Sequence, residues 1–105
     1  MKDSENKDLN LESRFDLAYN AAHALALAAL RLHGYRSENR YVVFQCLQHT
    51  LHLPPEKWRI VDQAHRLRNL AEYEGEVDIN AELVLALIRV GHELARQLKN
   101  KSKKA

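Results

Sequence analysis

Side chains that could bind or transfer a charged group gather in one stretch of this 105-residue sequence, 62–75. Four of them recur at spacings of three and four residues and so share one face of a helix: His65, Arg68, Asn69 and Glu72. Tyr73 follows directly and adds a phenol. Such a group, centred on the Arg68 guanidinium, can hold a phosphate or a ribose hydroxyl. The same residues are also typical of a solvated face on which Arg68 pairs with Glu72 one turn away.

The remaining reactive side chains indicate neither a metal centre nor a catalytic thiol. The six histidines form no HExxH pattern and no pair at i+4, and no cysteine pair accompanies them. We therefore predict no metal site and no cofactor. The single Cys46 stands beside Phe44 and Leu47, which favours a buried, inert thiol and excludes an internal disulfide.

Helices must position these residues, because Leu, Ala, Glu, Lys and Arg dominate the chain while only three Gly and two Pro interrupt it. The spacing of apolar residues predicts four helices, at about 11–33, 38–51, 56–74 and from 79 or 81 to about 100. Asn10 and Ser37 are predicted to cap the first two, and Asp78 or Asn80 the fourth. Helix ends are predicted at Gly34 and Gly75.

Short connections between helices of similar length predict an all-α, antiparallel up-down four-helix bundle over residues 10–99. Residues 1–9 are expected to be disordered, and 100–105 to form a disordered basic tail. The stretch Tyr41–Phe44 could also form a strand, but no second convincing strand could pair with it. The first helix carries a second stripe of mostly small residues, Leu17, Ala21, Ala24 and Ala28. This stripe indicates either a central helix or contact with a second subunit.

Charge and hydropathy limit the partners of the domain. The net charge is +2, and four lysines in 99–104 account for it. The body is not basic enough for a dedicated nucleic-acid binder, although the tail could attract RNA or an acidic partner. No signal segment or membrane-spanning run is present in the sequence. Together with a single cysteine, this favours the cytoplasm and no membrane partner.

The segment Arg68–Tyr73 resembles the signature of HEPN-domain proteins, which are small helical bundles. Phe15–His23 is similar to the first HEPN helix, Gly34–Arg36 to its end and Val43–Leu47 to the second helix. The resemblance extends over about 15–98. It implies a homodimer in which an Arg and a His from each of two subunits meet in a cleft and cut RNA without a metal.

The catalytic residues of the HEPN motif are only partly present in this sequence. Arg68 matches the HEPN arginine, Asn69 matches the polar residue that follows it, and Tyr73 stands where the histidine is expected. A phenol with a pKa near 10 is a poor general base at neutral pH. His65 precedes Arg68 and cannot simply replace the missing histidine. Tyr19 and His23, one turn apart on the first helix, could support the site, with His23 facing Arg68 across the bundle.

We therefore expect a HEPN-like homodimeric binding or regulatory module that holds nucleotide or RNA phosphate through Arg68. The resemblance also implies a minimal nucleotidyltransferase as partner, in a toxin–antitoxin-like system where Tyr73 could accept AMP. Two alternatives stay open. One is a metal-independent endoribonuclease with a non-standard dimer-cleft site, and the other is a bundle that only mediates protein assembly.

Overall fold

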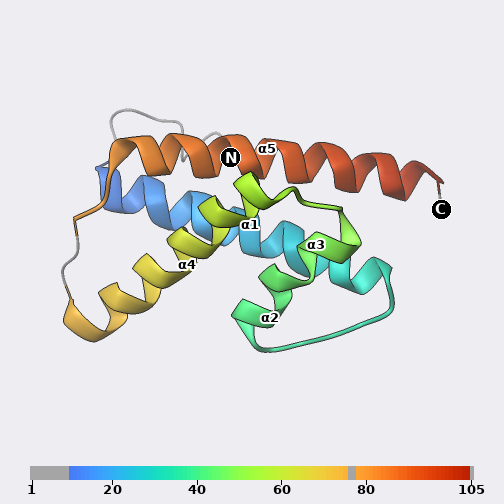
Figure 1. The fold of residues 1–105 in the computed structure, drawn as a ribbon, viewed down its shortest axis with the longest axis horizontal. Helices are drawn as coiled ribbons and strands as arrows, with labels where there is room; N and C mark the ends of the chain where they lie inside the picture. The colour runs from blue at the N-terminus through green and yellow to red at the C-terminus, as the bar shows by residue number, and fades with distance from the viewer. Residues whose placement is uncertain (1–9, 76–77, 105) are drawn as a thin grey trace.

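The computed structural model describes residues 10–75 and 78–104, with side chains up to Lys101, and this part of the chain is helical without any strand. Its elements are α1 (Leu11–Leu32), α2 (Arg40–Gln45), α3 (Leu47–Thr50), α4 (Pro55–Glu74) and α5 (Ala81–Lys104) (Figure 1). The predicted all-α helical bundle is confirmed. Each of the four predicted helical segments is helical, and the second is divided between α2 and α3.

Most helix ends lie where the sequence places them. Asn10 caps α1, since its side-chain oxygen accepts a hydrogen bond of 2.7 Å from the Ser13 amide. Asn80 rather than Asp78 precedes α5, and its side-chain oxygen accepts a 2.6 Å bond from the Glu82 amide. α4 ends at Gly75, whose φ of 82° is the left-handed conformation that glycine adopts without strain.

The predicted cap at Ser37 is wrong. Asn39 caps α2, because its side-chain oxygen accepts from the Val42 amide at 3.2 Å. The Ser37 hydroxyl instead accepts from the Asn39 amide at 3.1 Å. Both residues are good caps, so composition alone does not separate them. The turn formed by Ser37 sets the direction in which Asn39 enters the helix.

α5 packs against both other long helices, and most extensively against α1. α5 lies along α1 and runs in the same direction, while α4 crosses them and runs back toward the start of α1 (Figure 1). The short pair α2 and α3 covers the second half of α1. The largest fully buried side chains come from these elements: Tyr19, Phe44, Leu47, Leu87 and Leu94. The predicted antiparallel up-down arrangement is wrong, because the 33–39 connection runs back along α1 and the helices do not alternate in direction. α1 and α5 lie side by side and run in parallel (Figure 1).

α5 extends further than predicted. It continues through Lys104, so the segment 100–104, expected to be a disordered tail, continues the helix. The Lys101 ammonium donates to the Thr50 carbonyl oxygen and lies 2.9 Å from His33 Nε2. This contact ties the basic end of α5 to the ends of α1 and α3. The predicted disorder of 1–9 concerns residues outside the described part.

None of the helices in the described part of the chain is long and apolar enough to cross a membrane.

The core of α5 can be tested with a matched pair of leucines. Leu87 is 1% exposed and Leu85 is 45% exposed on the same helix. Leu87→Ala should lower the free energy of unfolding by about 2–5 kcal/mol, since it leaves a cavity against α1. Leu85→Ala removes the same atoms from an exposed face and should cost less than about 1 kcal/mol. Urea denaturation followed by circular dichroism measures both, and equal costs would contradict the packing of α5.

Candidate functional site

The polar strip on α4 divides into a part that faces α1 and a part that faces solvent. His65 is buried and Arg68 is partly buried, while Asn69 is exposed but reaches back to His65. Glu72 lies one turn after Arg68 and contacts its guanidinium. The structure therefore brings together four of the five predicted residues of α4.

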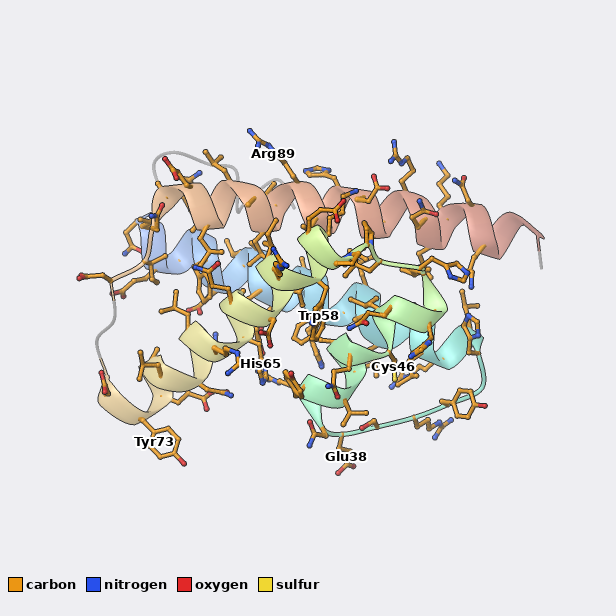
Figure 2. All side chains as sticks on the ribbon, in the orientation of Figure 1. Glu38, Cys46, Trp58, His65, Tyr73 and Arg89 are labelled. Atoms are coloured by element: carbon orange, nitrogen blue, oxygen red, sulfur yellow. The ribbon has the colours of Figure 1, made fainter. Side chains whose placement is uncertain are left out.

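Tyr73 does not join them. Its side chain is 92% exposed and points away from the end of α4 (Figure 2). Five residues along a helix correspond to a rotation of about 140° from Arg68, so the two side chains lie on different faces. The tyrosine that stands where a catalytic histidine was expected is thus remote from Arg68 within one subunit.

A buried hydrogen bond joins His65 to Tyr19 on α1. The Tyr19 hydroxyl lies 3.0 Å from His65 Nδ1, and the Asn69 amide nitrogen lies 3.2 Å from Nε2. In this orientation of the Asn69 amide, Nε2 accepts a hydrogen bond and Nδ1 donates one to the Tyr19 oxygen. Both ring nitrogens are occupied, and the side chains of Tyr19 and His65 are 1% and 8% exposed. Tyr19 therefore contacts the α4 strip through its hydroxyl at His65 and through its ring at Arg68.

Aromatic rings surround the His65 imidazole. The ring centroids of Tyr41, Phe44 and Tyr19 lie 5.2, 5.9 and 6.3 Å from that of His65. Burial lowers the pKa of His65, and the Asp62 carboxylate partly offsets this. His65 is therefore neutral at pH 7, as a buried imidazole with one donor and one acceptor partner should be.

The guanidinium of Arg68 is held between two carboxylates. Its Nη1 donates to Asp16 Oδ1 at 2.6 Å, and its Nε lies 3.6 Å from Glu72 Oε1. Its Cζ lies 5.4 Å from the Tyr19 ring centroid, within the range of a cation–π interaction. An open cavity of about 260 Å³ adjoins it, lined by Glu12 as well as Asp16 and Glu72. The charge of Arg68 is thus already balanced by acidic neighbours.

A second cation, Arg40 at the start of α2, completes the cluster. Its Cζ lies 6.0 Å from the Tyr19 ring centroid, and its side chain is otherwise exposed. Burial raises the pKa of the Tyr19 hydroxyl, while the hydrogen bonding and charge of Arg40 act in the opposite direction. We refer to Tyr19, Arg40, His65, Arg68 and Asn69 as the Tyr19 cluster.

His23 lies beside this cluster and not against Arg68. Its ring packs edge-on against Phe44 at a centroid distance of 5.6 Å. Burial lowers the pKa of His23, and the charge of Arg40 lowers it further. The cation that acts on His23 is therefore Arg40, which the sequence did not single out.

Sequence reasoning missed Asp16 and Arg40. The spacing of residues in the sequence could have indicated Asp16, because Asp16, Tyr19 and His23 recur at steps of three and four on α1. No such spacing could have indicated Arg40, because it reaches Tyr19 only through the fold of the 33–39 connection. Within the described residues, no three His, Cys, Asp or Glu side chains are grouped to hold a metal ion.

The neutral histidines predict how stability depends on pH. The unfolded chain takes up protons near pH 6.5, while folded His65 and His23 resist protonation until lower pH. The free energy of unfolding should therefore fall as pH drops from 7.5 to 5.5. His65→Gln should flatten this dependence in urea denaturation, since glutamine does not titrate. The exposed His49→Gln should keep the wild-type slope, and an equal flattening there would contradict the assignment.

Comparison with known proteins leaves the geometry of the cluster as the basis for inferring function. No protein-family model, no curated protein and no solved structure matches this chain.

Proposed function

We propose that this protein is a HEPN-like binding and regulatory module that recognises the phosphate groups of a nucleotide or RNA and does not cleave the RNA. The observation that carries the proposal is that His65 has no free ring nitrogen with which to act as a base. Both of its ring nitrogens are hydrogen-bonded and its side chain is 8% exposed. It cannot accept a proton from a ribose hydroxyl without breaking the bond to Tyr19 or the bond to Asn69.

The cations of the Tyr19 cluster support binding. The guanidinium carbons of Arg40 and Arg68 both lie within 6.0 Å of the centroid of one ring. The ion pairs of Arg68 with Asp16 and Glu72 involve partly exposed carboxylates, and such pairs contribute only about 0–1 kcal/mol. A phosphate group that reaches Arg40 can therefore displace one carboxylate from Arg68 and form a bidentate contact.

The partners belong to the same proposal. A second copy of the chain would cover the small-residue stripe of α1, on which Leu17 and Ala24 are exposed. A minimal nucleotidyltransferase would act on the exposed Tyr73, whose hydroxyl is accessible as an AMP acceptor. This module fits a two-component, toxin–antitoxin-like pair in the cytoplasm.

The main alternative is a metal-independent ribonuclease assembled by two subunits. Glu72 favours it, because its carboxylate is exposed next to Arg68 and could act as a base. A bundle that only mediates protein assembly is the other alternative. RNA binding and RNA integrity, measured together, separate the three functions.

The test of RNA binding compares two arginines of α4. Arg68→Ala should weaken the binding of a labelled single-stranded RNA about tenfold in fluorescence anisotropy, as expected for the loss of a charged hydrogen bond. Arg66→Ala removes an exposed arginine paired with Asp62, and it should change binding less than twofold. The wild type should leave the RNA intact. Cleavage that disappears in Arg68→Ala would establish the ribonuclease instead, and no binding by the wild type would leave the assembly function.

The proposed homodimer can be tested by its mass. Light scattering at micromolar concentration should give twice the mass of one chain. Leu17→Glu combined with Ala24→Glu should produce monomers, because two charges would be buried between the α1 helices. Gln63→Glu on the exposed face of α4 adds a charge elsewhere and should leave the mass unchanged. A monomeric wild type would remove the dimer and any composite cleft.

A further inference from the structure

A concentration of positive charge lies beside the Tyr19 cluster, in a groove between α1 and the 33–39 connection. The groove has a volume of about 610 Å³ and is open to solvent on one side. Its lining includes three arginines, which come from three different places in the chain: Arg31, Arg36 and Arg40. We call it the arginine groove. Its volume is within the range of small-molecule sites, about 300–1,000 Å³.

The local fold explains why these side chains converge. His23, Leu27 and Arg31 continue the spacing of four residues that begins at Tyr19, so they form one wall along α1. The chain then reverses at Gly34, whose φ is 82°. The Tyr35 amide bonds back to the Leu30 carbonyl oxygen at 3.2 Å. This reversal returns the 35–39 segment along α1 and forms the opposite wall (Figure 1).

The charges of the groove are less balanced than those around the paired arginines of α4 and α5. Arg66, Arg68 and Arg96 each have a carboxylate partner. In the described part of the chain, no ion pair is formed by Arg31 or Arg36. Glu38 is the one acidic residue in the lining, against three arginines. The electrostatic potential of the groove is therefore positive, although the body of the protein is close to neutral.

We propose that the arginine groove binds the phosphate groups of a nucleotide, either free or within an RNA chain. Arg31 and Arg36 provide planar, bidentate donors for phosphate oxygens, and the Ser37 hydroxyl adds a neutral donor. Leu27 and the ring of His23 give the wall an apolar part against which a base can lie. The inference shares its ligand class with the proposed function, on which it rests, but it assigns the contacts to residues other than Arg68.

The experiment uses the full chain and four probes. Adenosine, inorganic phosphate, 5′-AMP and a short labelled oligoadenylate RNA are titrated by calorimetry or anisotropy. AMP and RNA should bind, and adenosine should not, because the phosphate is the group recognised. Tighter binding of RNA than of AMP would identify the chain as the source of the phosphates. Equal binding of RNA and AMP, with inorganic phosphate competing against both, would identify a free nucleotide as the source of the phosphate.

The test variant is Arg31→Gln with Arg36→Gln. It should weaken RNA binding about tenfold or more and reduce the slope of log Kd against log salt by about 1.4, about 0.7 for each lost phosphate contact. The matched control is Arg59→Gln with Arg89→Gln. Both of these arginines are exposed, and Arg89 points away from the groove on the far side of α5 (Figure 2). Circular dichroism checks that all variants keep the wild-type helicity.

The outcomes separate the two proposals. Equal losses in the test and control variants would show a general charge effect and overturn the groove. Loss of binding in Arg68→Ala without loss in the Arg31 and Arg36 variant would also overturn the groove but leave the proposed function standing. Absence of binding by the wild type to every probe would overturn both.

Discussion

The hydrogen bond between Tyr19 and His65 sets the arrangement of α4 on α1. Its two groups are almost fully buried and 3.0 Å apart. A buried polar group without its partner costs about 1–3 kcal/mol, so a shift of α4 along α1 by one turn would break this bond and leave His65 Nδ1 without a partner. With this register in place, Arg68 comes opposite Asp16 and forms their 2.6 Å contact. The polar pair fixes alignment in a core that is otherwise built from non-directional apolar contacts.

The same bond limits the chemistry available at this end of the molecule. A histidine that catalyses proton transfer needs one ring nitrogen free for substrate. His65 has neither nitrogen free, and aromatic rings enclose it. Its ring therefore makes the contacts of a structural histidine in this chain. The nearest exposed polar groups are a guanidinium and its carboxylates, which are suited to binding a charged ligand.

Local signals in the sequence were enough to predict the helices and one face of the site. Asn10, Gly34 and Gly75 act through their own backbone or their nearest neighbours, so their roles could be recognised. Spacing also placed His65, Arg68 and Glu72 on one face. It did not exclude Tyr73, because the inclusion of that residue came from a motif and not from helix geometry. The choice of Asn39 over Ser37 depended on a turn that no periodicity describes.

Arg40 shows why the remainder could not be predicted, and it links the Tyr19 cluster to the arginine groove. It lies 6.0 Å from the Tyr19 ring centroid and also lines the arginine groove. These contacts arise because the connection after α1 folds back, which is a property of the whole chain. Burial lowers the pKa of both His23 and His65, and the charge of Arg40 adds to this effect. A phosphate that neutralises Arg40 would weaken this effect and make both imidazoles easier to protonate. By linkage, ligand binding in the groove and proton uptake by the core histidines would then favour each other.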